Sequence, residues 1–167
     1  MEIREFNIQD AAAALAFFRK LVHEDPERVE RPQDVARLTI ADEKRWIQER
    51  TDKEKAGEFF TRVAIEETSI VAEGEVERMK RWIERHVAEL RFGVLPGNEV
   101  AAEKLVQKLI RVARAHGIEV LIYFHLATQK RGIRIAEKVG FRAIGKAKRY
   151  YKRGKTYTDR VYMLLNL

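Results

Sequence analysis

The spacing of apolar residues divides the chain into helices and strands with two different periods. Between Glu99 and His116 apolar residues recur every three or four positions, which predicts an amphipathic helix that ends at Gly117. The segment Ile118–Leu126 is almost continuously apolar, as expected for a strand covered on both faces. Polar and apolar residues alternate in Arg85–Val94, which predicts a preceding strand with one face in the core. Together these segments predict a strand–helix–strand unit.

The rest of the chain predicts shorter elements around this unit. The predicted strands are Glu2–Phe6, Phe59–Glu66, Ser69–Met79, Phe141–Tyr151 and Thr156–Leu165, and the predicted helices are Ala11–Val22, Gln33–Arg50 and Lys130–Val139. Asp10 is expected to cap the first of these helices, and Thr51–Lys55 is expected to form a charged turn. This order predicts an α/β (α+β) fold, with a mixed, mostly antiparallel central sheet and helices on both faces. One domain spanning residues 1–167 is expected.

The composition excludes several classes of function. The chain contains no cysteine, which excludes disulfides, a cysteine nucleophile and zinc sites built on cysteine. Its four histidines lack the spacing of metal ligands, so no metal site is expected. No apolar run approaches the roughly 18–20 residues needed to span a membrane, and the charged N-terminus does not resemble a secretory signal. We therefore expect a cytoplasmic protein. The abundance of Glu, Lys and Arg with a single serine is typical of hyperthermophile proteins.

The positive charge gathers in the C-terminal part of the chain. Residues 1–103 carry 17 basic and 23 acidic side chains, a net charge of −6, whereas residues 104–167 carry 16 and 3, a net charge of +13. Three interpretations remain open: a solvated basic face, a site for a polyphosphate cofactor, or a surface for nucleic acid. The segment Arg149–Lys155 interleaves aromatic and basic residues, which suits either a solvated hairpin or single-stranded nucleic acid.

The turn between the alternating strand and the long helix is a candidate anion site. Pro96-Gly97-Asn98 follows the strand directly, and the helix begins at once. Asn98 is a residue type that often caps helices. The first N–H groups of a helix have no partner within it, and its dipole favours negative charge. The turn therefore predicts binding of a cofactor that bears phosphate.

Four segments resemble the motifs of the GNAT superfamily of N-acetyltransferases in order and spacing. They are Val94-Leu95-Pro96 (its V-x-P), Leu105, Leu109, Ala113 and Gly117 (its L-x3-L-x3-A-x3-G helix), Ala136–Phe141 (its Y-E-K-x-G-F), and Gly154-Lys155 with Asp159 and Met163 (the G-K-x3-D-x3-M ending of phosphinothricin-type members). The resemblance covers nearly the whole chain.

The resemblance implies acetyl-CoA as co-substrate and a primary amine, in a small molecule or a peptide, as acceptor. It implies that the pyrophosphate lies at the start of the Glu99 helix, and that the pantetheine pairs with the strand ending at Val94. The implied cofactor-binding residues are Phe92, Val94, Gly97, Asn98, Glu99, Val100, Ala101, Ala102 and Gln129. Three departures are visible: the turn lacks the family's glycines and basic residue, Gln129 replaces an asparagine, and Ala136 replaces the tyrosine that protonates the departing thiolate.

Glu89 is the candidate catalytic base, because a carboxylate can take the proton of the attacking amine. The alternative is a solvated strand carboxylate paired with an arginine, and Glu73 and Glu75 on the preceding strand are further candidates. Tyr150 is the candidate proton donor to the thiolate, with Tyr151, Tyr157 or water as substitutes.

His125 is read either as a proton shuttle or as a core histidine.

The sequence thus favours an N-acetyltransferase whose acceptor is not encoded in any recognisable motif. Two alternatives stay open: a GNAT-shaped protein with little catalysis that binds CoA, another acyl-CoA or a protein partner, and a basic nucleic-acid-binding module. No membrane is expected as a partner, nucleic acid is not the favoured one, and a homodimer is left open.

Overall fold

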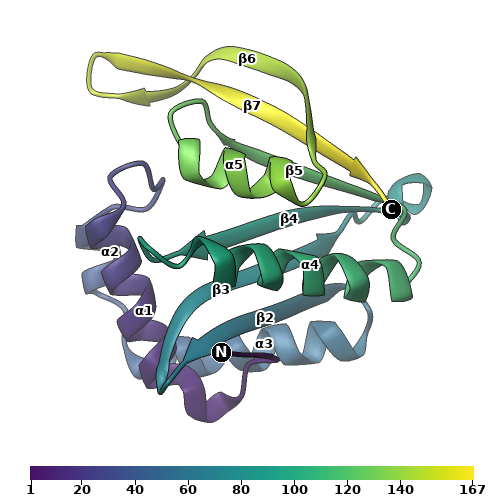
Figure 1. The fold of residues 1–167 in the computed structure, drawn as a ribbon. Coiled ribbons are helices and arrows are strands. Elements are labelled where there is room, and N and C mark those ends of the chain that lie inside the picture. The colour runs from purple at the N-terminus through teal and green to yellow at the C-terminus, as the bar shows by residue number, and fades with distance from the viewer.

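Seven strands form one sheet in the order β1-β2-β3-β4-β5-β7-β6, in a computed structural model that describes residues 1–167 (Figure 1). The strands are β1 (Glu2–Arg4), β2 (Phe59–Glu66), β3 (Ser69–Arg78), β4 (Val87–Val94), β5 (Val120–Leu126), β6 (Arg142–Arg153) and β7 (Thr156–Asn166). All neighbouring strands are antiparallel except β4 and β5, which are parallel. The predicted mixed, mostly antiparallel sheet is therefore confirmed.

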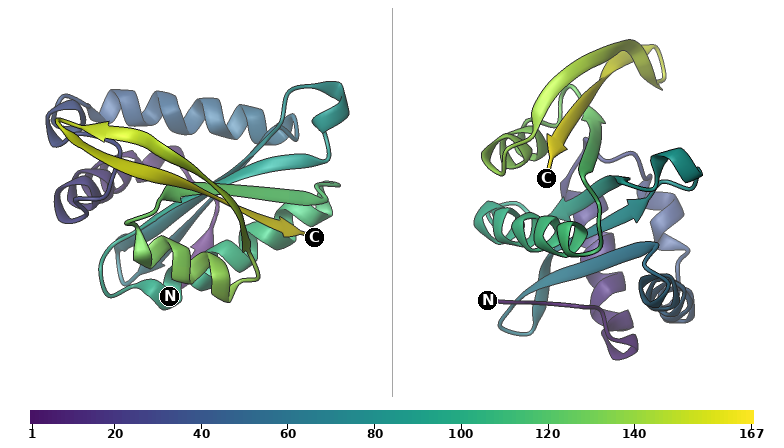
Figure 2. Two further views of the ribbon diagram at one scale, coloured as in Figure 1. Left: turned by 90° about the horizontal axis from the view of Figure 1, so that it is seen from above. Right: turned by 90° about the vertical axis from the view of Figure 1, so that its right-hand side faces the viewer.

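Helices cover both faces of the sheet. They are α1 (Ala11–Glu24), α2 (Pro32–Ala36), α3 (Ile40–Lys55), α4 (Glu99–Ala115) and α5 (Lys130–Lys138). Viewed along the sheet, α3 lies on one side and α4 and α5 lie on the other (Figure 2). The hairpin of β6 and β7 extends past the layers at one edge (Figure 1). No helix has both the length and the apolar character that crossing a membrane would require.

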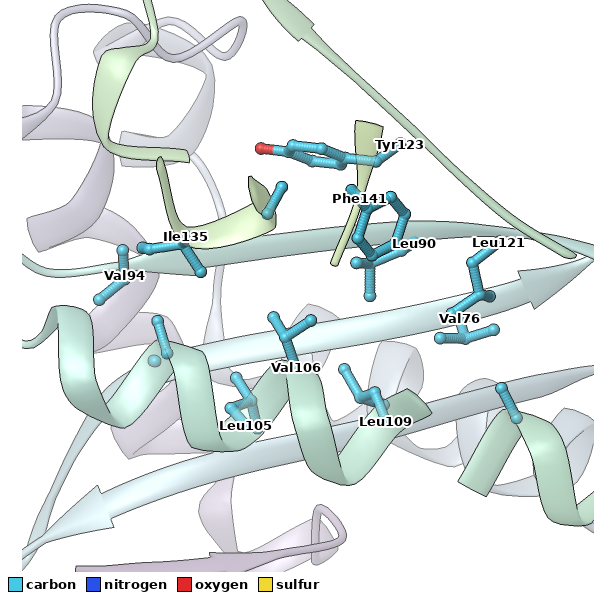
Figure 3. Close-up of a cluster of buried hydrophobic side chains, with 14 of the residues drawn as sticks. Val76, Leu90, Val94, Leu105, Val106, Leu109, Leu121, Tyr123, Ile135 and Phe141 are labelled. Carbon is cyan, nitrogen blue, oxygen red and sulfur yellow. The ribbon is translucent and has the colours of Figure 1, made fainter. Parts of the chain in front are cut away.

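The larger core fixes α4 against the sheet, and with it the turn that precedes the helix. Leu105 and Leu109 are completely buried between α4 and the strands (Figure 3). The helix lies so close to β3 that a Cβ added at Gly74 would meet a Leu109 methyl at 2.7 Å. Because α4 begins five residues after β4 ends, this packing holds the first turn of α4 at the carboxyl end of that strand.

The helical region predicted as Gln33–Arg50 is instead two helices, α2 and α3, so that prediction was wrong. The chain is extended at Thr39, whose hydroxyl accepts a hydrogen bond from the Asp42 N–H while the Asp42 carboxylate accepts one from the Thr39 N–H. This reciprocal capping box starts a new helix.

The charged turn predicted at Thr51–Lys55 is also wrong, because α3 continues to Lys55. Its polar side chains interact at helical spacing: Gln48 and Lys55 both bond to Asp52. The helix stops before Gly57, which has a φ of 71°.

The two predicted helix caps act differently from expectation. Asp10 precedes α1 but makes no capping bond to it; Asn7 instead caps the short 3-10 helix Ile8–Asp10 that leads into α1, and the Asp10 carboxylate accepts a hydrogen bond from the Asn7 N–H. The Asn98 side chain does not cap α4. Its amide donates to the carbonyl oxygens of Leu95 and Pro96, which fixes the turn before the helix.

Candidate active site

The parallel strands β4 and β5 separate in the middle of the sheet. They pair only from Val87–Leu90 with Val120–Tyr123, and the rest of each strand diverges. The Leu95 N–H donates to the Val71 carbonyl of β3. Since alternate residues of a strand direct their N–H and C=O groups to opposite edges, Phe92 and Val94 direct theirs toward the opening. Both residues lie where the sequence predicted contacts with pantetheine.

The first turn of α4 stands at the wide end of this opening. Gly97, with a φ of 86°, makes the turn, and the first bond within the helix comes from the Ala102 N–H to the Asn98 carbonyl. The N–H groups of residues 99–101 therefore have no helical partner, which is the arrangement expected for an anion site. The other predicted binding residues from Gly97 to Ala102 lie in this turn, with Val100 exposed and Ala101 and Ala102 buried.

An arginine from α5 supplies positive charge at this turn. Arg131 Nε lies 3.2 Å from the Glu99 carboxylate, and Arg131 Nη1 donates to the Val94 carbonyl at 3.5 Å. The Glu99 carboxylate also accepts a 3.4 Å hydrogen bond from the Gly97 N–H. Arg131 thus supplies, from another helix, the positive charge that the sequence of the turn itself lacks. The sequence could not reveal it, because Arg131 belongs to a different helix.

Gln129 lies at the N-terminus of α5, on the other side of the opening. Its side-chain oxygen accepts a hydrogen bond from the Leu126 N–H at 3.0 Å, and its side-chain nitrogen donates to the Glu27 carbonyl at 2.9 Å. The side-chain amide of this predicted cofactor-binding residue therefore joins β5 to the loop between α1 and α2.

A cavity of about 550 Å³ lies against the sheet on the α3 side. Its walls include residues of β3 and β4, of α1 and α3, and of both edges of the opening between β4 and β5. Arg153, near the tip of the β6–β7 hairpin, donates to the carbonyl oxygens of Pro26 and Arg28, so the hairpin is tied to the loop that borders the cavity. Two of the residues predicted to bind acetyl-CoA, Phe92 and Gln129, line this cavity.

Alternating residues of β3 and β4 place carboxylates on the cavity side. The register pairs Glu73 with Gly93, Glu75 with Arg91, and Glu77 with Glu89. Arg91 lies 2.6 Å from Glu75, 2.5 Å from Glu77 and 3.8 Å from Glu89. Three of the four carboxylates thus share one guanidinium. Glu89 lies in the cavity wall together with Glu73 and Glu75.

Glu73 is the carboxylate that has no partner. It makes no hydrogen bond or ion pair within the protein, and its cross-strand neighbour Gly93 lies on the diverging part of β4. Burial, reinforced by the negative charge of Glu75 and only partly opposed by the positive charge of Arg28, raises the pKa of Glu73 to about 8. Burial also raises the pKa of Glu89, but the nearby Arg91 and Arg160 oppose that change. A carboxylate with a pKa near neutrality is well suited to take a proton from an amine.

The predicted proton donor lies outside the cavity wall. Tyr150 is half exposed, and its hydroxyl accepts a hydrogen bond from Arg160 at 2.7 Å. Its neighbour Tyr151 does line the cavity, whereas Tyr157 is exposed beside the Arg149 guanidinium.

His125 is 2% exposed, and its Nδ1 lies 2.9 Å from the Leu126 carbonyl, which makes that nitrogen the donor. Burial lowers the pKa of His125, which favours a neutral ring at the cavity wall.

Sequence reasoning missed two cavity residues with distinctive environments. Tyr123 lies within an almost continuously apolar strand and was not singled out. Glu43, in the first turn of α3, lacks an ion-pair partner, and burial raises the pKa of its carboxyl. The capping-box spacing of Thr39 and Asp42 would have located the start of α3, and with it Glu43.

Comparison with solved structures finds the same fold in several acetyltransferases. A GNAT-family acetyltransferase from Streptococcus pneumoniae is 20% identical, with 99% of each chain covered and a TM-score of 0.87. A ribosomal-protein-alanine N-acetyltransferase from Brucella melitensis is 22% identical over 100% of each chain, with a TM-score of 0.82. A phosphinothricin acetyltransferase from Sinorhizobium meliloti, in complex with acetyl-CoA, is 17% identical over 99% of this chain and 88% of its own, with a TM-score of 0.81.

No curated protein matches the sequence. The sequence model of the acetyltransferase (GNAT) domain, however, matches residues 3–162. With the strand order and the separation of β4 from β5, this match shows that the chain belongs to the GNAT family of acetyltransferases.

Proposed function

We propose that this protein transfers the acetyl group of acetyl-CoA to the nitrogen of a primary amine bound in the carboxylate-lined cavity. The observation that carries the proposal is the continuity between two sites. Residues from both edges of the β4–β5 opening, among them Phe92 and Phe124, line the same cavity as Glu73 and Glu89. A donor entering from the α4 side and an acceptor in the cavity would therefore meet at the opening.

Acetyl-CoA would lie along β4 with its pyrophosphate at the first turn of α4. The N–H groups of Glu99 and the two residues after it would receive the phosphate oxygens. Pantetheine would pair with the exposed backbone of Phe92 and Val94 in the manner of an added strand. The Phe92 N–H would then be available to the carbonyl oxygen of the thioester, where negative charge develops during acyl transfer.

Two carboxylates compete for the role of base. Glu89, the residue favoured by the sequence, shares Arg91 with two other carboxylates. Glu73 has no such partner, has a pKa of about 8, and lies across from Gly93, one residue after Phe92. Cross-strand neighbours have Cβ positions roughly 5 Å apart, so Glu73 would lie within reach of an amine attacking at Phe92. We therefore assign the base to Glu73 and a supporting electrostatic role to Glu89.

The reaction then balances with groups of this chain. The amine nitrogen bonds to the thioester carbonyl carbon, and its proton passes to the Glu73 carboxylate. The tetrahedral oxyanion accepts a hydrogen bond from the Phe92 N–H. Cleavage of the carbon–sulfur bond leaves its electron pair on sulfur, and protonation of sulfur gives CoA and the amide.

The cavity favours an acceptor that carries positive charge before it reacts. Glu43 and Glu73 are carboxylates without ion-pair partners, and the negative charge of Glu43 adds to the cost of ionising Glu73. Trp46, packed edge-on against Phe6, forms part of the same wall. Carboxylates and aromatic faces together are typical of sites that bind ammonium groups.

Glu99→Gln is expected to tighten acetyl-CoA binding by about 3- to 10-fold, because the change removes a negative charge where the pyrophosphate would lie.

Arg131→Ala should weaken acetyl-CoA binding by about tenfold, because it removes the guanidinium that is paired at this turn. Isothermal titration calorimetry with acetyl-CoA measures both. Glu103→Gln, farther along α4, is the matched control and should leave affinity unchanged. Weaker binding by Glu99→Gln would contradict this view of the turn.

Calorimetry followed by a transfer assay tests the proposed function itself. The wild-type protein should bind acetyl-CoA, and CoA release in a panel of amines should depend on the amine and yield its acetylated form by mass spectrometry. Binding without transfer to any amine would favour the weakly catalytic CoA-binding alternative. No binding of acetyl-CoA at millimolar concentration would rule out both the proposed acetyl transfer and the CoA-binding alternative.

A further inference from the structure

Three buried side-chain nitrogens have no hydrogen-bond partner, and all three belong to residues that line the cavity. They are Arg50 Nε, His125 Nε2 and Arg160 Nε. Buried polar groups in folded proteins nearly always have a partner. The unsatisfied hydrogen-bonding capacity of the interior is therefore concentrated at this one cavity.

Four arginines line the cavity, and three of them have partners within the chain. Arg28 pairs with a neighbouring carboxylate at 2.8 Å, Arg91 pairs with carboxylates of β3 and β4, and Arg160 donates to a tyrosine hydroxyl. Arg50 is the exception, because no carboxylate lies within ion-pair distance of it and its buried Nε has no acceptor. Its positive charge is therefore free to meet a ligand.

Aromatic rings hold the Arg50 guanidinium at the cavity wall. Its central carbon lies 5.2 Å from the centre of the Trp46 ring and 4.3 Å from the centre of the Phe59 ring. Aromatic rings attract a cation, but the five N–H donors of a guanidinium still need oxygen acceptors. Arg50 is thus a positioned cation whose donors remain available to an anion.

Arg50 lies well along α3 from the residue that stands beside the proposed base. Glu43, Trp46 and Arg50 all line the cavity, and their spacing places them on one face of α3. The negative charge of Glu43 acts on Glu73. Arg50 follows Glu43 by about two turns, or roughly 10 Å along the helix.

The register of the sheet gives the same order. Arg50 lies over Phe59, which pairs across the sheet with Glu77 of β3. Burial raises the pKa of Glu75, which lies between Glu77 and Glu73, and Arg50 is one of two arginines that oppose this rise. A strand advances about 3.3 Å per residue, so the level of Arg50 is roughly 7–13 Å from Glu73 along β3. Helix and strand therefore agree that about 10 Å separates the free cation from the proposed base.

A ligand that uses both Glu73 and Arg50 must carry its amine and its anionic group far apart. An α-amino acid has both groups on the same carbon atom, so it cannot span this separation with them. A planar carboxylate matches two parallel N–H donors of a guanidinium. A phosphate dianion would bring a second negative charge near Glu75, which already lies within the influence of Arg50. The site therefore favours a carboxylate.

We propose that the acceptor is an ω-amino acid, whose carboxylate binds Arg50 while the primary amine at its other end lies at Glu73. This assignment rests on the proposed acetyl transfer, which places the amine at Glu73. The carboxylate is unchanged by the reaction, whose products are the N-acetyl ω-amino acid and CoA. Arg50 selects the acceptor by charge and length, and it takes no part in bond formation.

Three amines of similar size test the charge and the spacing. In 6-aminohexanoate the two groups lie at opposite ends, in its isomer 2-aminohexanoate they share one carbon, and hexylamine has no carboxylate. The wild-type protein should acetylate 6-aminohexanoate with a kcat/KM about 10- to 100-fold above that for either of the others, the usual effect of hydrogen bonds to a charged group. Arg50→Gln should lower the ratio of kcat/KM for 6-aminohexanoate to that for hexylamine by about 10- to 100-fold.

Calorimetry of 6-aminohexanoate with the CoA complex measures the carboxylate site without turnover. Arg50→Gln should weaken this binding by about 10- to 100-fold, and Arg50→Lys, which keeps the charge, should recover part of the loss. Lys44→Gln, on the exposed face of α3 and outside the cavity wall, is the matched control and should leave the Kd unchanged. Circular dichroism checks that the variants are folded.

Equal kcat/KM for 6-aminohexanoate and hexylamine in the wild-type protein would overturn the proposal, as would a preference for 2-aminohexanoate or an unchanged ratio in Arg50→Gln. Each of these results still includes acetylation of an amine and so leaves the proposed function standing. Failure of the proposed function gives a different result, in which no amine of the panel is acetylated. Arg50-dependent binding of 6-aminohexanoate would even then support the carboxylate site.

Discussion

Replacing Glu73 by glutamine is expected to lower kcat/KM for acetyl transfer by about 10²–10⁴-fold, the usual contribution of a general base. Glutamine keeps the shape of the side chain but cannot accept a proton from the amine. The expectation rests on the position of Glu73 across from Gly93, on its lack of a partner, and on its pKa of about 8. Initial rates of CoA release, measured with any amine that the wild-type protein acetylates, give the comparison.

Glu89→Gln is the matched control, because Glu89 lies on the same face and also lines the cavity. Its loss should lower kcat/KM by less than about tenfold, as expected for a supporting charge. The kcat/KM of the wild-type protein should also rise with pH as Glu73 ionises. This rise should be absent from Glu73→Gln. A large loss of kcat/KM in Glu89→Gln, with near-normal kcat/KM in Glu73→Gln, would mean that Glu89 and not Glu73 is the base.

The same substitution is expected to stabilise the folded protein in alkaline solution. The unfolded chain releases the Glu73 proton near the ordinary pKa of 4.5, whereas the folded protein holds it until about pH 8. Over that interval the folded state binds more protons than the unfolded state, so the free energy of unfolding falls as pH rises. Below the interval both states are protonated, and Glu73 costs nothing.

Glu73→Gln should therefore match the wild type near pH 4 and exceed its free energy of unfolding by about 2–4 kcal/mol near pH 9. Urea unfolding at several pH values measures the difference. Glu66→Gln, at the exposed end of β2, serves as control and should leave the pH dependence unchanged. Equal stability of Glu73→Gln and wild type at alkaline pH would mean that Glu73 ionises freely in the folded protein.

Local patterns predicted most of the fold. The helical spacing before Gly117 and the apolar run that follows gave α4 and β5 to within two residues. The break between α2 and α3 was missed, although Thr39 and Asp42 carry the capping-box spacing that marks it. The apolar residues on both sides of the break suggested one continuous helix, and they outweighed this local signal.

The site was predictable only where one segment forms it alone. The turn at Gly97 and the residues on β4 follow from a single strand–turn–helix segment. The pairing of Arg131 with Glu99 requires the packing of α5 beside α4, which no local pattern encodes. The difference between Glu73 and Glu89 likewise depends on the register of β3 and β4, which decides which carboxylates meet Arg91. A shift of this register would rearrange all of these pairs.

A crystal structure of the complex with acetyl-CoA tests the central claim most directly. We expect the pantetheine between β4 and β5 beside Phe92 and Val94, the pyrophosphate within hydrogen-bonding distance of the first N–H groups of α4, and the Glu99 carboxylate displaced toward solvent. The acetyl group should face the cavity near Glu73. Acetyl-CoA bound elsewhere, with the β4–β5 opening empty and Glu99 still bonded to Gly97, would contradict the account.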